Sequence, residues 1–182
     1  MRSRPLSGKL RIMQRRALLA LGATGMLAQA QQIPRVADFE MTTTAGPVKL
    51  TQYRGKAVVL ALIRSSCSHC QVTTQLLRSL QQEFGAKVQM LGCDFVEDGA
   101  IVVPQFIERY KPGFPVGWTS TEKAFKFLQL SLMTPGTVPK LVFIDKKGMI
   151  RAQYDGTDAA MSGEGSAQRD KIKAKIVEVS AF

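Results

Sequence analysis

The apolar residues of the chain occur either in continuous runs or at helical spacing. Residues 57–63 (AVVLALI) and 87–95 (KVQMLGCDF) are largely apolar runs, which is typical of strands covered on both faces. Between them, residues 68–84 predict a helix that ends at Gly85, because the apolar positions fall on one face. These positions are Val72, Leu76, Leu77, Leu80 and Phe84. The three elements together predict a β-α-β unit with parallel strands.

The remaining pattern predicts further helices and a hairpin. Residues 48–56 alternate like a strand and end in a glycine turn. Helices are expected over three ranges: from about Pro104, over 120–130 and over 168–179. Residues 140–145 (KLVFID) and 149–156 (MIRAQYDG) predict two strands joined by the turn KKG. A β-α-β unit followed by a hairpin predicts an α/β sandwich, in which a mixed central sheet carries helices on both faces.

The first thirty residues have the composition of a secretory signal peptide. Six basic residues and no acidic residue precede Ala17. A run of small apolar residues, ALLALGATGMLA, follows and ends in an Ala28-Gln29-Ala30 cleavage signal. The run has about 12 residues, fewer than the ~20 that span a bilayer, which favours cleavage over an N-terminal membrane anchor. Met13 offers a second start, because the segment from Met13 onward is a complete signal peptide by itself.

Charge points to export rather than to nucleic acid. The 182 residues carry a net charge of +11, which falls to +5 once residues 1–30, with six of the 25 basic residues and none of the 14 acidic ones, are removed. The remaining basic residues form no dense run, so we expect no nucleic-acid partner and no stable membrane insertion of the mature chain. We divide the chain into a signal peptide at 1–30, an exposed N-terminal lead at 31–47 and one domain at 48–182. The protein is expected in the periplasm or another extracytoplasmic space.

Candidate chemistry centres on Cys67-Ser68-His69-Cys70, which holds two of the three cysteines and the one histidine of the chain. Cys67 falls at the predicted start of the helix, where free N–H groups and the helix dipole favour a thiolate. Cys70 follows one turn later, within reach of a disulfide. A charged His69 would stabilise the thiolate further and make the disulfide a stronger oxidant. Three cysteines are too few for a disulfide scaffold, so we interpret the pair as a redox couple.

The segments around this motif carry a family resemblance. The entry YRGKAVVLALI, the Cys-x-x-Cys pair and the later TVPKLVFIDKKGMIRAQYDG resemble the thioredoxin fold in its AhpC/TSA–Redoxin branch. Within that branch the chain resembles the exported TlpA/ResA-like thiol–disulfide oxidoreductases from about residue 35 to residue 180. The resemblance implies a thioredoxin-like three-layer sandwich.

The resemblance also implies roles for single residues. Cys67 would attack substrate disulfides and Cys70 would resolve the mixed disulfide, while Ser68 and His69 would tune the thiolate. Pro139 would be a cis-proline that faces the cysteines, and Val138 would offer its backbone to a substrate strand. No cofactor and no metal are implied. The expected partners are cysteine-containing exported proteins, such as apocytochromes c, and a membrane or periplasmic redox partner.

Four positions near the motif depart from the family pattern. The family has an aromatic residue before the first cysteine, an acid and a proline after the second, and a buried acid in the preceding strand; the chain has Ser66, Thr73, Gln75 and Ala61 there. The usual carboxylate proton acceptors for the second cysteine are therefore missing from their expected positions. His69 and Val138 resemble their counterparts in the DsbA oxidases, which favours an oxidising potential.

Two other functions stay open. The AhpC/TSA branch includes thiol peroxidases, whose reactive cysteine usually follows a Pro-x-x-x-Thr-x-x motif; here Arg64 stands at the threonine position. A Cu(I)- or zinc-binding metallochaperone-like module could use Cys67, Cys70 and Cys93. Structural zinc normally takes four ligands from two separated pairs, and only one pair is present. Cys93, at the end of a predicted buried strand, is expected to be an inert buried thiol.

Overall fold

The two apolar runs form the centre of the sheet, as predicted. In the computed structural model, which describes residues 33–133, 137–163 and 165–182, β4 (Ala57–Ile63) is buried at every residue. It pairs in parallel with β5 (Val88–Asp94) and antiparallel with β7 (Lys140–Ile144). The β7–β8 hairpin, in which β8 spans Met149–Tyr154, adds the antiparallel strands expected from the sequence. The signal peptide predicted over 1–30 lies outside the described residues.

The complete sheet is mixed and has the strand order β1-β8-β7-β4-β5-β6-β2-β3. Its shorter strands are β1 (Arg35–Val36), β2 (Glu40–Thr43), β3 (Gly46–Lys49) and β6 (Val116–Trp118). Short 3-10 helices follow β3 at Leu50–Tyr53 and precede β5 at Gly85–Lys87.

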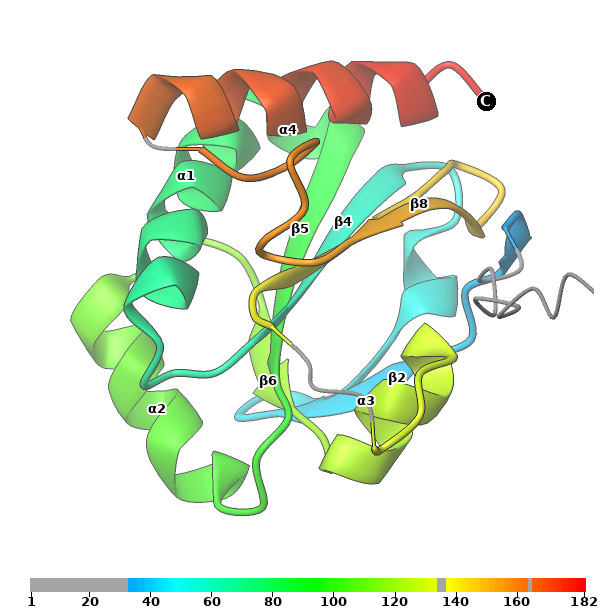
Figure 1. Ribbon diagram of the computed structural model, residues 1–182. Coiled ribbons are helices and arrows are strands. Elements are labelled where there is room, and N and C mark those ends of the chain that lie inside the picture. Colours follow the sequence, from blue (N-terminus) through cyan, green and yellow to red (C-terminus); the bar gives the residue numbers. More distant parts are fainter. Residues whose placement is uncertain (1–32, 134–136, 164) are drawn as a thin grey trace, which may run out of the picture. The chain divides into compact units, whose positions relative to one another are not determined.

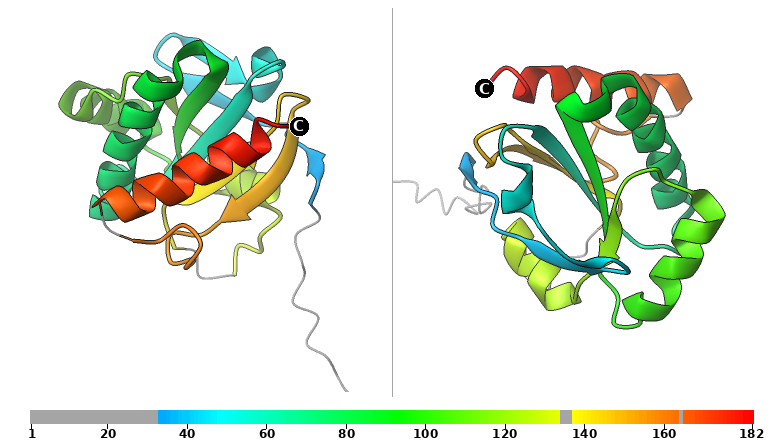
Figure 2. Two further views of the ribbon diagram at one scale, coloured as in Figure 1. Left: turned by 90° about the horizontal axis from the view of Figure 1, so that it is seen from above. Right: turned by 180° about the vertical axis from the view of Figure 1, so that it is seen from behind.

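Helices cover both faces of the sheet, which gives the predicted three-layer α/β sandwich (Figures 1 and 2). α1 (Ser68–Phe84), α2 (Gly99–Tyr110) and α4 (Gly165–Val179) contribute to one apolar core, and α3 (Thr121–Leu128) contributes to the other. α1 matches its predicted range. Ser120 begins α3 by accepting a hydrogen bond from the backbone N–H of Lys123 at 3.3 Å, as a helix N-cap does.

The segment 31–47 is not the exposed lead that the sequence predicts. Its described part forms β1, β2 and the start of β3, and the side chains of Ala37, Phe39 and Met41 are buried. These apolar residues alternate with polar ones, so the extended segment that runs from β1 into β2 turns all three toward the core. The ring of Phe39 packs 4.6 Å, centroid to centroid, from that of Phe127 in α3. The domain therefore begins before residue 48.

The helix predicted from Pro104 begins earlier, at Gly99, and Pro104 lies inside it. At this start, Gly99 packs directly on the side chain of Trp118 in β6. Such a contact between distant segments cannot be read from local spacing. Among the described residues, no helix combines the length and apolar character needed to cross a bilayer.

Candidate active site

Cys67 lies where the central strand passes into the first helix. β4 ends at Ile63, and Cys67 is the N-cap of α1, with φ −85° and ψ 121°. Its backbone N–H donates to the carbonyl of Arg64 at 3.0 Å, and its carbonyl accepts from the N–H of Gln71 at 3.1 Å. The side chain is partly exposed. Cys67 thus lies at the helix N-terminus, the position predicted from the sequence, with part of its side chain exposed.

Cys70 lies one turn further along α1 and is fully buried. Its Sγ accepts a hydrogen bond from the backbone N–H of Arg64 at 3.4 Å. Burial raises the pKa of the Cys70 thiol; the Arg64 N–H lowers it, while Cys67 and the charge of Asp94 raise it further, so that it stays well above its ordinary value. Cys70 is therefore held as a neutral thiol close to Cys67.

A buried carboxyl group, which the sequence-based reasoning missed, lies beside this pair. Asp94 ends β5 opposite Ile63 of β4 and has no exposed surface. Its Oδ2 accepts a hydrogen bond from the backbone N–H of Ser65 at 2.8 Å. Burial raises the pKa of Asp94 above its ordinary value, although the Ser65 hydrogen bonds and the charge of Arg64 oppose this. The signal in the sequence is a single acid at the end of the apolar run VQMLGCDF.

The turn between β4 and α1 is held from both sides. The backbone N–H of Ser65 bonds Asp94, and the Ser65 carbonyl accepts from the side-chain amide of Gln71 at 2.9 Å. The Arg64 guanidinium lies over the ring of Phe95, 4.8 Å from its centroid. Because both α1 and the residues at the end of β5 contact this turn, the positions of Cys67 and Cys70 are fixed relative to the sheet.

The structure brings His69 close to Pro139. Both line a pocket of about 390 Å³ whose walls also include Val72 and Thr73. The Val138–Pro139 peptide bond is cis. Val138 is half-buried and packs against both apolar cores. Ser68 is the exposed first residue of α1.

Cys93 does not join the other two cysteines. It is fully buried in the core under α3, whereas Cys70 belongs to the core on the opposite face of the sheet. Its thiol donates to the carbonyl of Asp94 at 3.6 Å, and burial raises its pKa well above the ordinary value. This is the buried thiol that the sequence predicts. Within the described ranges, no three metal-binding side chains converge on one point.

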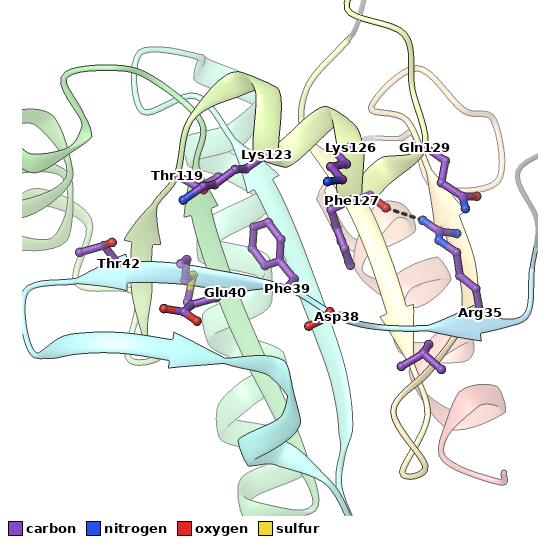
Figure 3. A pocket seen from close by; sticks show the side chains of 12 residues that line it. Arg35, Asp38, Phe39, Glu40, Thr42, Thr119, Lys123, Lys126, Phe127 and Gln129 are labelled. Atoms are coloured by element: carbon purple, nitrogen blue, oxygen red, sulfur yellow. Dashed lines mark hydrogen bonds between the residues drawn. The ribbon is translucent and has the colours of Figure 1, made fainter.

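A second pocket, of about 520 Å³, lies between the β1–β2 segment and α3 (Figure 3). Arg35 reaches across it from β1 and donates from Nη2 to the carbonyl of Phe127 at 2.8 Å. Lys123 and Lys126 from α3 line the same pocket, as do the carboxylates of Asp38 and Glu40. None of the predicted site residues lines it.

Comparisons with known proteins agree with this geometry. The model of the AhpC/TSA family matches residues 32–153. No match to an individual curated protein is found.

Similar solved structures share the fold. A protein assigned as the thiol:disulfide interchange protein DsbE from Chlorobium tepidum has a TM-score of 0.67 and 18% identity, covering 82% of this chain and 99% of its own. A secreted Mycobacterium tuberculosis disulfide oxidoreductase homologous to E. coli DsbE has a TM-score of 0.60 and 16% identity, covering 78% and 96%. The exposed lipoprotein thioredoxin Etrx1 from Streptococcus pneumoniae has a TM-score of 0.58 and 24% identity, covering 78% and 99%. The chain therefore belongs to the AhpC/TSA family and has the fold of thioredoxin-like thiol–disulfide oxidoreductases.

Proposed function

We propose that this protein is an exported thiol–disulfide oxidoreductase that exchanges disulfides with cysteine-containing proteins through the Cys67–Cys70 couple. The observation that carries the proposal is the unequal pair at the start of α1. Cys67 is partly exposed at the helix N-cap, and Cys70 is fully buried one turn behind it. An accessible nucleophile backed by a protected thiol is what a two-step exchange requires.

The exchange proceeds through a mixed disulfide. The Cys67 thiolate attacks one sulfur of a substrate disulfide, whose S–S bond breaks and releases the other substrate sulfur as a thiolate. Cys70 then attacks Cys67 in the mixed disulfide, which forms the Cys67–Cys70 disulfide and releases the second substrate thiolate. Run in reverse, the same steps oxidise a substrate dithiol. His69 and Ser68 tune the Cys67 thiolate from the first turn of α1.

Substrate recognition is assigned to the surface around Pro139. The pocket lined by His69, Val72 and Pro139 would take the residues next to the substrate cysteine. Val138 would pair its backbone with an extended substrate segment, in the way that a strand adds to a sheet edge. The substrates would be exported proteins with cysteine pairs, including apocytochromes c, and a membrane or periplasmic partner would reset the couple. Export rests on the signal peptide predicted over 1–30.

The reduction potential of the Cys67–Cys70 couple tests this function directly. The protein would be equilibrated against glutathione or dithiothreitol, alkylated and weighed by mass spectrometry. A potential near −120 mV, like that of DsbA, would identify an oxidase, and one near −270 mV, like that of thioredoxin, a reductase. A pair that never closes into a disulfide would overturn the proposal.

The AhpC/TSA family match also supports a thiol peroxidase as a second candidate. In that case Cys67 would attack a peroxide and be oxidised to a sulfenic acid that Cys70 resolves. Arg64, where peroxidases usually have threonine, argues against it. Consumption of hydrogen peroxide with a thiol reductant distinguishes the two: we expect rates no higher than those of a Cys67→Ser variant.

A further inference from the structure

Two neighbouring backbone amides place the sulfur of Cys70 and the carboxyl group of Asp94 side by side. The N–H of Arg64 donates to Cys70 Sγ at 3.4 Å, and the N–H of the next residue, Ser65, donates to Asp94 Oδ2 at 2.8 Å. Both acceptors also lie on the same face of the sheet. Asp94 pairs with Ile63, whose side chain packs in the same core as Cys70, whereas Cys93 faces the other core.

One oxygen of this carboxyl group lacks a partner. Asp94 is fully buried, and among the described residues its Oδ1 has no hydrogen-bond partner. Buried polar atoms are nearly always hydrogen-bonded, so an exception of this kind calls for an explanation. A role as proton acceptor would explain the free oxygen, because such an oxygen can take up a proton without first losing another hydrogen bond.

The charged and titratable groups around Asp94 come from four segments of the chain. Arg64 lies in the turn before α1 and favours the carboxylate, and Asp98 in the loop after β5 disfavours it. Cys70 faces it from α1, and Cys93 precedes it in β5. Of the two thiols, only Cys70 shares its face of the sheet.

We propose that Asp94 acts through Cys70 as the proton acceptor of the resolving step. The inference rests on the function proposed above. Cys70 passes its Sγ proton to the Asp94 carboxylate and attacks Cys67 in the mixed disulfide. The Cys67–Cys70 bond forms as the substrate sulfur leaves with the bonding pair. In the opposite direction the protonated carboxyl group returns the proton to Cys70 as its sulfur leaves.

This assignment answers a question that the sequence raises. The strand position where thioredoxins carry their buried acid is Ala61, which cannot accept a proton. Ala61 pairs with Gly92 on the neighbouring strand, and Asp94 follows two residues later on the same face. The acid is thus supplied by β5 instead of β4. A thiol whose pKa is raised by burial needs such an acceptor to react near neutral pH.

The test follows a single resolving event. Cys67 is first converted to its mixed disulfide with thionitrobenzoate, and attack by Cys70 then releases that coloured thiol at a measurable rate. The rate would be recorded from acid to alkaline pH for the wild type, Asp94→Asn and Asp98→Asn. Asn keeps an oxygen for the Ser65 N–H but cannot take the proton. Asp98→Asn, which removes an exposed carboxylate four residues away, is the matched control.

We expect Asp94→Asn to release the thiol about 100-fold more slowly than the wild type at neutral pH. This difference in rate should disappear at high pH, where hydroxide removes the Cys70 proton instead. Asp98→Asn keeps the acceptor and removes only a nearby negative charge, so it should show no such deficit at neutral pH. Equal profiles for Asp94→Asn and the wild type, or a deficit that is the same at every pH, would overturn the role of Asp94. If the proposed function itself is wrong, Cys70 does not resolve the mixed disulfide. Release of the thiol would then be as fast in Cys70→Ser as in the wild type.

A second measurement covers the case in which Asp94→Asn does not fold. Infrared difference spectra of the wild-type protein, dithiol minus disulfide, would be recorded with and without ¹³C in the aspartate carboxyl groups. The proposal predicts a labelled carboxyl band that changes with the redox state and persists in Asp98→Asn. A spectrum without a redox-dependent aspartate band between the two states would refute it.

Discussion

Cys70 is fully buried one helical turn behind the partly exposed Cys67, so the two sulfurs of the pair have unequal access to a substrate. The difference follows from the helix, since the N-cap lies at the surface and Cys70, three residues later, turns back toward the sheet. In the proposed exchange, Cys67 would therefore meet the substrate, and Cys70 would attack a sulfur that is already bonded to Cys67.

Cys67→Ser should abolish disulfide exchange, and Cys70→Ser should accumulate mixed disulfides with its substrates. The first variant lacks the nucleophile, and the second lacks the group that releases the substrate. Both can be measured with a reduced or scrambled model protein, using non-reducing gels and mass spectrometry. Cys93→Ser is the control and should exchange like the wild type, because Cys93 lies under the opposite face of the sheet. Full exchange by Cys67→Ser would exclude the assignment.

His69→Phe should make the Cys67–Cys70 couple more reducing. His69 is exposed and within the motif, and the positive charge of a protonated imidazole at this position would favour the thiolate form, hence the dithiol. Each ~1.4 kcal/mol of lost thiolate stabilisation lowers the reduction potential by about 30 mV. Equilibration with glutathione buffers measures the shift, with Gln82→Ala, an exposed position near the other end of α1, as a control that removes no charge. An unchanged or higher potential in His69→Phe would show that His69 does not tune the couple.

Local pattern was enough to predict the centre of the fold and the position of the cysteines. Strands buried on both faces and an amphipathic helix leave strong periodic signals, and together they place Cys67 at the start of α1. The β1–β2 segment was missed because its strands are short and its apolar residues are few. Asp94 was missed for another reason. Its role depends on a contact with Ser65, 29 residues away, and the pairing of β4 with β5 brings these segments together.

The free energy of unfolding of Asp94→Asn should exceed that of the wild type increasingly as pH rises. The folded-state pKa of Asp94 is raised above 3.8, so the folded protein holds this proton more tightly than the unfolded chain. The resulting stabilisation is complete below pH 3.8 and is lost as pH rises through the folded-state pKa. Each unit of difference between the two pKa values corresponds to ~1.4 kcal/mol. Urea unfolding of the reduced proteins from acid to alkaline pH measures this, and a constant difference would contradict it.

Asp145 should show the opposite dependence on pH. It is buried at the β7–β8 turn, where the Met149 N–H donates to its Oδ1 at 2.9 Å and Arg151 Nε donates to its Oδ2 at 2.6 Å. Burial raises the pKa of Asp145, but these donors and the charge of Arg151 outweigh burial and lower it below 3.8. Its contribution to stability is therefore present above pH 3.8 and is lost as pH falls through the folded-state pKa.

Asp145→Asn should accordingly cost about 1–3 kcal/mol at neutral pH and less in acid. Urea unfolding over the same pH series provides the measurement. Asp158→Asn, at a half-exposed position after β8, serves as the comparison. A loss of stability that does not shrink as pH falls would show that the charge of Asp145 is not what stabilises the turn.

Gly99→Ala should destabilise the junction between α2 and β6. A Cβ at position 99 would overlap the Cβ and Cγ of Trp118, and since Gly99 is buried, neither side can yield without moving a helix or a strand. Overpacking of this kind costs about 1–3 kcal/mol. Trp118 is the one tryptophan of the chain, so its fluorescence reports the local change while urea unfolding gives the loss of stability. Ala100→Ser, at the exposed next residue, should change neither signal, and a Gly99→Ala variant as stable as the wild type would show that this contact does not set the start of α2.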